Sequence, residues 1–206
     1  MPGEIELKVY GLGSIGKVPE EVYVGLVVLF VVGTGFFLWK KGWREGLRAS
    51  SVLLLVEWVF LILCTAVIFR ESSESSRINL IPLSSYFDIA ENSYLMEVAA
   101  INILNVLMFI PVGLLLGLGQ GTRNHGDTEP RNYGRGWTSV ILIGSGLSLT
   151  IEILQFIFKR GLCEADDIIH NLLGCIVGFA IYRLISRLIK TCISIFSRES
   201  STFLSL

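Results

Sequence analysis

Charged residues are scarce in this sequence, and their scarcity argues against whole classes of protein. Of 206 residues, only 17% are Asp, Glu, Lys or Arg, whereas an average soluble domain has about 25%. The formal net charge is −1, and no basic stretch carries interleaved aromatic residues. These features give no support for a nucleic-acid-binding protein, so we expect no nucleic-acid partner.

Cysteine is also rare, and its spacing argues against the usual metal and disulfide frameworks. The four cysteines show no paired spacing for zinc or for a set of bridges. A glycine-rich segment at residues 11–17 imitates a phosphate-binding loop, but Val18 replaces the hydroxyl residue of that motif, and no strand–turn–helix unit follows. We therefore expect no nucleotide, no structural metal and no cofactor.

Apolar residues, in contrast, are abundant and form long runs. They make up 52% of the chain, and the mean hydropathy is +0.64. About 20 helical residues, rising 1.5 Å each, cross the roughly 30 Å hydrocarbon core of a membrane. Five runs approach this length, at about residues 22–39, 51–69, 98–118, 139–158 and 168–189. The sequence predicts an all-α, polytopic transmembrane helical bundle with about five spans, located in the cell membrane as a multi-pass protein.

The connections between these runs predict the orientation of the bundle. Lys and Arg concentrate in cytoplasmic connections, and eleven lie on one side of the predicted bundle against six on the other. The eleven are Lys40, Lys41, Arg44, Arg48, Arg123, Arg131, Arg135, Arg183, Arg187, Lys190 and Arg198, and the six are Lys8, Lys17, Arg70, Arg77, Lys159 and Arg160. We predict a short extracellular N-terminal tail at 1–21, one transmembrane domain at 22–190 and a short cytoplasmic C-terminal tail at 191–206. The oligomeric state stays open.

Polar residues interrupt the last two runs at helical spacing. In the fourth run they recur every three or four residues, which places them on one face of a helix. They are Ser145, Ser148, Glu152, Gln155 and Lys159. In the fifth run, Asp167 and Asn171 precede Gly174 and Gly178 on one face, and such small residues let helices approach closely. An ionisable residue inside a membrane costs roughly 2.5–3.5 kcal/mol, so it is normally paired or functional.

The third run adds two amides, Asn102 and Asn105, with Pro111 below them. Pro111 has no N–H to donate to the carbonyl of Leu107, so we expect this helix to kink and to open space beneath the amides. In the predicted topology, the polar faces of three helices meet at the extracellular side, together with Arg70 and a loop at 79–82. The sequence thus predicts one outward-facing polar cavity.

Several short motifs with fixed spacing run through this region. They are Asn105-x-x-x-Phe109-x-Pro111-x-Gly113, Glu152-x-x-Gln155, Arg160-Gly161-Leu162 and Glu164-x-Asp166-Asp167-x-x-His170-Asn171-x-x-Gly174, with Arg70 and Asn79-Leu-Ile-Pro82 upstream. Together they closely resemble the VanZ-like membrane proteins, from about residue 69 to residue 178. The chain departs from the family pattern at Cys163, a usual aromatic position, and at Leu172, where a small polar residue is common.

The resemblance carries an expectation about function. The family takes its name from a teicoplanin-resistance protein of Gram-positive bacteria. What the resemblance implies for this chain is a role in the cell envelope, with antibiotic resistance of the teicoplanin type as one expected phenotype.

Two functions are compatible with these residues. In the first, a non-enzymatic protein binds a lipid-linked cell-wall component or a lipoglycopeptide antibiotic in the outward-facing cavity, where arginines hold an anionic group and amides hold amides or sugars. The candidate ligand-binding residues are Arg70, Asn79, Asn105, Gln155, Arg160, Glu164, Asp166, His170 and Asn171. In the second, a membrane enzyme acts on an envelope lipid or cell-wall precursor, with Glu152 as general acid or base and Asp167 as a second carboxylate. Because no nucleophile elbow or cofactor motif is present, binding is favoured, with membrane lipids as further partners.

Structural roles compete with these interpretations. Asp166 and Asp167 match the acids that complement the dipole at a helix N-terminus, and the amides can serve as interhelical hydrogen bonds. Arg70 and Arg160 can mark the membrane interface. His170 lies one residue off the predicted polar face, which favours a packed or interfacial group over a catalyst.

Two ion pairs of the acidic residues are also expected, and a cation site is an alternative. Glu152 is expected to be held by Arg70 or Arg160, because an uncompensated carboxylate at that depth is expensive. Glu57, outside the motifs, is expected to pair with Arg183 at a similar depth. A divalent cation is a further alternative, since hard cations favour clustered carboxylates. Its ligands would be Glu152, Glu164, Asp167 and His170.

Overall fold

A computed structural model describes residues 17–72, 77–83, 95–121 and 133–203 of the chain. Most of the predicted N-terminal tail, the phosphate-loop imitation and most of the third connection lie outside these residues. The described part contains five helical segments long and apolar enough to cross a membrane: Glu20–Trp43, Glu45–Ile68, Ala99–Gln120, Gly136–Ile157 and Ala165–Phe196. The predicted all-α transmembrane bundle is therefore confirmed, and the predicted spans agree with these segments to within a few residues at most ends.

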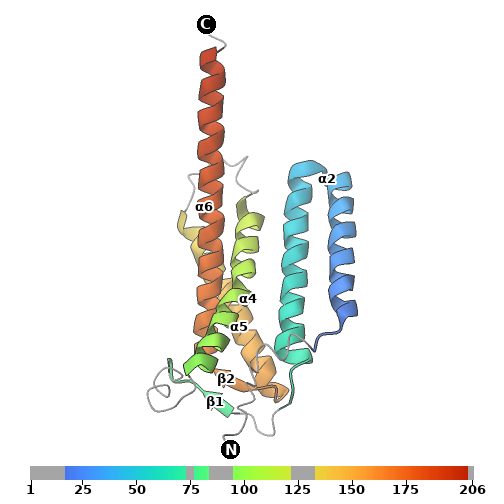
Figure 1. Cartoon of the computed structure of the whole chain (residues 1–206), viewed down its shortest axis with the longest axis vertical. Coiled ribbons are helices and arrows are strands. Elements are labelled where there is room, and N and C mark those ends of the chain that lie inside the picture. The colour runs from blue at the N-terminus through green and yellow to red at the C-terminus, as the bar shows by residue number, and fades with distance from the viewer. Residues whose placement is uncertain (1–16, 73–76, 84–94, 122–132, 204–206) are drawn as a thin grey trace, which may run out of the picture.

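The first two spans form one helical hairpin, α2, at Glu20–Leu63. Its two arms lie side by side and run in opposite directions (Figure 1). The break between them is at Gly42, whose φ of 73° and ψ of 179° suit a residue without a Cβ. None of the apolar stretch of the first arm is buried, so this arm lies at the edge of the bundle. The second arm continues into a π-helix, η1, at Cys64–Ile68, which leads directly to Arg70.

The other three spans are α4 at Leu95–Gly121, α5 at Tyr133–Ile157 and α6 at Ala165–Phe203. α4 and α6 approach closely at glycines, as the small-residue pattern predicted. A Cβ on Gly178 would overlap the Ile110 carbonyl oxygen, and one on Gly174 would overlap that of Val106. α6 continues without a break to Phe203, and its C-terminal part projects beyond the other helices (Figure 1).

The buried core lies where α2, α4, α5 and α6 meet. Its members are Ile62, Val67, Phe109, Val112, Val140, Ile151, Cys175 and Phe179. Trp58 ties α2 to α4 by donating its indole N–H to the Met108 carbonyl over 2.9 Å. The helix α4 runs through Pro111 as one element, so the predicted kink does not divide it.

Two short strands pair at the end of the bundle where α6 begins (Figure 1). β1 is Arg77–Asn79, β2 is Leu162–Glu164, and they are parallel, with Asn79 opposite Glu164. The sequence predicted only connecting loops here. The pairing brings the connection after η1 against the connection between α5 and α6, so residues far apart in sequence share one end of the bundle.

The close contact of α4 and α6 predicts an asymmetric response to added methyl groups. Gly178→Ala should lower the free energy of unfolding by about 1–3 kcal/mol or more, because the new Cβ overpacks against backbone. Gly146→Ala in α5 is the matched control, since a Cβ there meets nothing within 4 Å. It should be neutral or stabilising by up to about 1 kcal/mol through helix propensity. Titration with SDS in mixed micelles measures both, and equal stabilities would contradict the tight contact.

Two cysteines at opposite ends of the bundle test the predicted orientation. Cys163 lies in β2, and Cys192 is exposed on the projecting part of α6. The distribution of Lys and Arg predicts that Cys163 faces the outside and Cys192 the cytoplasm. A membrane-impermeant maleimide should label a variant that retains only Cys163 in intact cells and spare one that retains only Cys192. Permeabilised cells provide the control, and the reverse pattern would overturn the orientation.

Candidate functional site

Polar side chains from α4, α5, α6, the two strands and the connections beside them gather at the strand end of the bundle. We call this group the polar cluster. Its members are Arg70, Asn79, Asn105, Glu152, Gln155, Arg160, Glu164, Asp166, Asp167 and Asn171. All were singled out from the sequence, and the fold brings them to one end through the C-terminal end of α5, the N-terminal end of α6 and the two strands.

Glu152 is the most deeply buried charged residue of the polar cluster, with 1% of its surface exposed. Its Oε2 accepts a hydrogen bond from the Glu164 backbone N–H over 3.0 Å. The sequence predicted a guanidinium as the direct partner of Glu152. In the structure, Arg70 acts on Glu152 only electrostatically. The hydrogen bond that Glu152 accepts from β2 fixes the connection between α5 and α6.

Asp167 joins α6 to α4. Its Oδ1 accepts a hydrogen bond of 2.7 Å from the Asn105 Nδ2, and Arg70 and His170 act on it electrostatically. This hydrogen bond joins residues of two separate sequence motifs, an amide on α4 and a carboxylate at the start of α6. A hydrogen bond from a neutral amide leaves the carboxylate charge available to a further partner.

The two arginines support each other. Arg160 donates a hydrogen bond from its Nη1 to the Arg70 carbonyl, and Arg70 interacts electrostatically with three carboxyl groups, those of Glu152, Glu164 and Asp167. Gly161 lies directly against the Arg70 guanidinium, because a Cβ there would be 2.9 Å from the Arg70 Cζ. Its φ of 150° also disfavours any other residue. The glycine of the motif thus makes room for the arginine.

β2 carries two titratable groups at the edge of the polar cluster. Burial raises the pKa of the Glu164 carboxyl above its ordinary value of 4.5, and the charges of Asp167 and Asp166 raise it further, while a hydrogen bond with Asn79 and the charge of Arg70 oppose the rise. Burial also raises the pKa of the Cys163 thiol, and Glu152, Asp167 and Glu164 add to this effect. The Cys163 thiol is therefore mainly protonated at neutral pH and reacts slowly, so a maleimide should label it faster as the pH is raised.

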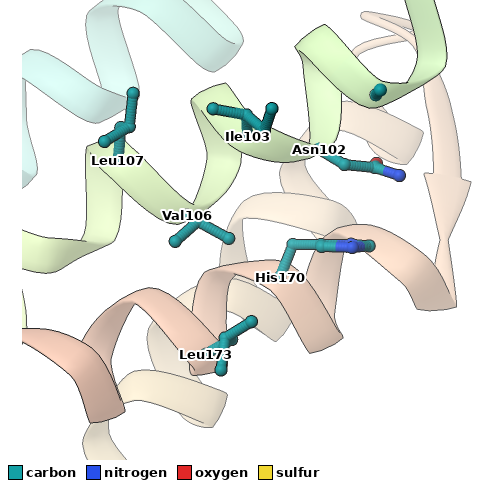
Figure 2. A pocket seen from close by; sticks show the side chains of 7 residues that line it. Asn102, Ile103, Val106, Leu107, His170 and Leu173 are labelled. Atoms are coloured by element: carbon teal, nitrogen blue, oxygen red, sulfur yellow. The ribbon is translucent and has the colours of Figure 1, made fainter.

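Asp166 and His170 have different surroundings from Asp167. The Asp166 Oδ1 accepts a hydrogen bond from the Leu83 backbone N–H, which fastens the segment after β1 to the start of α6. The His170 Nδ1 lies 2.6 Å from the Asp166 carbonyl oxygen. The His170 ring lies at the seam between α4 and α6, beside Asn102 (Figure 2). His170 therefore borders the polar cluster at the seam between α4 and α6.

Two amides connect the polar cluster to the core by interhelical hydrogen bonds. The Asn171 Nδ2 donates to the Ser148 Oγ over 2.9 Å, and the Gln155 Nε2 donates to the Ala66 carbonyl over 3.1 Å. The Gln155 Oε1 is buried, and no described residue bonds to it. The structural role foreseen for these amides is therefore present, and Gln155 keeps one acceptor unused within the described part of the chain.

Among the described residues, one other expected pairing is not formed, and neither is the alternative cation site. Glu57 is 5% exposed and its Oε1 has no hydrogen-bond partner among the described residues, while the Arg183 guanidinium lies 5.9 Å from the Phe179 ring centroid. Across residues 17–72, 77–83, 95–121 and 133–203, no group of three or more His, Cys, Asp or Glu side chains is arranged to hold a metal ion. The carboxylates of the polar cluster are instead spread among backbone, amide and guanidinium partners.

Sequence reasoning missed the partners that are backbone groups. The N–H groups of Glu164 and Leu83 and the carbonyls of Arg70 and Ala66 carry no sequence signal of their own. Ser148 was visible as part of the polar stripe on the fourth span, but its bond to Asn171 required the packing of α5 on α6.

Known proteins are similar to the part of the chain that contains the polar cluster. Residues 51–186 match the VanZ/LLP1 family. Protein VanZ of Enterococcus faecium is 35% identical over 80 residues, which cover 39% of this chain and 42% of that relative. The match thus spans less than half of the length of this curated relative. No solved structure matches the chain.

The hydrogen bond to Glu152 predicts different effects for two substitutions. Glu152→Gln keeps an oxygen acceptor for the Glu164 N–H, so the free energy of unfolding should change by less than about 1 kcal/mol. Glu152→Ala leaves that N–H unpaired and opens a cavity, so it should destabilise by roughly 2–5 kcal/mol. SDS titration in mixed micelles compares the two variants. Equal losses of unfolding free energy would show that the hydrogen bond does not hold the connection between α5 and α6.

Proposed function

Because this chain belongs to the VanZ/LLP1 family, we propose that it is a membrane protein of the bacterial cell envelope whose polar cluster binds the polar head of a lipid-tailed envelope molecule. The observation that carries the proposal is the concentration of carboxylates, amides and guanidinium groups at one end of an otherwise apolar bundle. Such groups inside or beside a membrane are expensive unless they are paired or functional. The structural pairs account for some of them and leave more carboxyl groups than arginines.

The charged groups of the polar cluster indicate which chemical groups the polar head of the ligand should carry. Its acids outnumber its arginines by four to two: they are Glu152, Glu164, Asp166 and Asp167 against Arg70 and Arg160. Arg160 already bonds to the Arg70 carbonyl, and Arg70 faces three carboxyl groups. The arginines are thus less suited to an anionic group than the sequence suggested. An acid-rich site favours a head that presents ammonium, amide and hydroxyl groups.

Two kinds of molecule combine such a head with a hydrocarbon tail. Lipid-linked cell-wall intermediates carry peptide and sugar groups, and lipoglycopeptide antibiotics of the teicoplanin type carry the same groups on a different scaffold. The resemblance to a family named after a teicoplanin-resistance protein makes the second kind the first ligand to test. Binding at the outer face would keep such a molecule near the membrane surface.

Catalysis by Glu152 and Asp167 is the second proposal. The burial of Glu152 to 1% exposure, with the charge of Asp167 acting on it, is the observation that favours it. A buried carboxyl group beside a second carboxylate can serve as a general acid or base. Envelope lipid profiles of cells with and without the protein separate the two proposals, because only an enzyme creates a new or depleted lipid species.

Binding of a tailed ligand predicts a selective change in drug susceptibility. Expression in a sensitive Gram-positive host should shift susceptibility to teicoplanin more than to vancomycin, which has no acyl chain. Asp167→Asn should abolish the shift, because it removes the charge that the Asn105 amide orients. Glu20→Gln, an exposed carboxylate at the start of α2, is the matched control and should leave the shift unchanged.

The outcomes of that experiment separate the possible readings. Equal shifts for both drugs would argue against recognition of the tail. No shift for either drug, with stable protein in the membrane, would replace lipoglycopeptides by another envelope ligand. A shift that persists in Asp167→Asn would remove the polar cluster from the explanation.

A further inference from the structure

We infer that the groove between α4 and α6 holds the hydrocarbon tail of the same molecule whose head occupies the polar cluster, an inference that rests on the proposed function. The groove has a volume of about 410 Å³, within the roughly 300–1,000 Å³ of ligand pockets. Its walls come from two helices that both begin at the strand end of the bundle (Figure 2). The lining residues are Ala99, Asn102, Ile103, Val106, Leu107, His170 and Leu173.

The groove is lined almost entirely by apolar surface, and Asn102 and His170 are its two polar residues. Asn102 and His170 lie at its end nearer the polar cluster, and Val106, Leu107 and Leu173 follow further along α4 and α6 (Figure 2). A helix rises 1.5 Å per residue, so Leu107 lies about 7.5 Å deeper than Asn102. An apolar groove that starts beside the polar cluster matches an amphiphile whose polar part is at the membrane surface and whose tail points toward the centre of the bilayer.

The groove is open to the membrane at its apolar residues, whereas Asn102 and His170 are buried. The side chains of Ile103, Leu107 and Leu173 are 58%, 53% and 46% exposed, and both helices lie within membrane-spanning segments. What they face there is hydrocarbon, not water. A hollow between closely packed helices loses dispersion contacts unless atoms fill it, so a chain from the surrounding lipid phase is the occupant that this environment supplies.

The groove and the polar cluster share the same two helices. Asn102 lies one helical turn before Asn105, and His170 one turn after Asp167, and the Asn105–Asp167 hydrogen bond joins the helices at 2.7 Å. His170 also contacts the Asp166 carbonyl, so the polar end of the groove is continuous with the polar cluster. A head at the polar cluster therefore places its tail beside this seam, and the ligand enters sideways from the outer leaflet.

Binding to the full-length protein in nanodiscs tests the inference, with teicoplanin and its deacylated form as probes and empty nanodiscs as the blank. Leu173→Trp fills the groove from its rim and should weaken teicoplanin binding by at least about tenfold, the lower end of the effect of altered space in an apolar pocket. Binding of the deacylated form should not change. Leu142→Trp is the matched control, because Leu142 is 67% exposed on α5 and away from the groove.

The variants distinguish failure of this inference from failure of the proposed function. If Leu173→Trp keeps the full preference for the acylated probe, the tail lies in bulk lipid and the groove assignment is overturned, while the head site stands. If the wild-type protein binds neither probe, both proposals fall for this ligand class. Ile103→Trp fills the groove from the facing helix, so it gives the same test if Leu173→Trp does not fold.

Discussion

The arrangement of this protein depends on one constraint: polar side chains placed in or beside hydrocarbon are costly unless they find partners. Glu152 meets this constraint through the Glu164 N–H, and Asp167 meets it through the Asn105 amide. Each of these bonds joins elements that the apolar packing alone would not fix in register. The hydrogen bond between Asn171 and Ser148 does the same for α5 and α6. The polar residues therefore determine how three apolar helices align at one end, and the same residues make up the candidate site.

The tight packing of α4 on α6 gives that site a firm base. Val106 illustrates the connection, because a Cβ on Gly174 would overlap its carbonyl while its side chain lines the groove. Backbone contact at the glycines leaves little freedom for the helices to separate. The groove beside this contact is thus a preformed feature of the helix pair, with the side chains of Asn102 and His170 near its end at the polar cluster. A rigid seam between a polar cluster and an apolar groove suits a ligand that is itself polar at one end and apolar at the other.

Much of this could be predicted from the sequence, because hydropathy and helical periodicity are local signals. They identified the spans, the polar face of Glu152 and Gln155, and the glycine contact of α6. What they could not give was the identity of backbone partners, as with the Leu83 N–H that bonds to Asp166. The pairing of β1 with β2 was missed because three-residue strands lack a periodic pattern. Glu57 and Arg183 were paired by depth alone, and depth does not fix the direction in which a side chain points.

If the polar cluster and the groove hold one amphiphile, that molecule should leave the membrane together with the protein. Native mass spectrometry of the full-length protein, released directly from the membranes of its host, detects such a complex. We expect an adduct that survives release and that dissociates as a molecule with both a polar head and a hydrocarbon chain. The adduct should be depleted in Asn105→Ala, which removes the amide partner of Asp167, and kept in Glu20→Gln. An unliganded mass for the wild-type protein, or an adduct of equal abundance in Asn105→Ala, would contradict it.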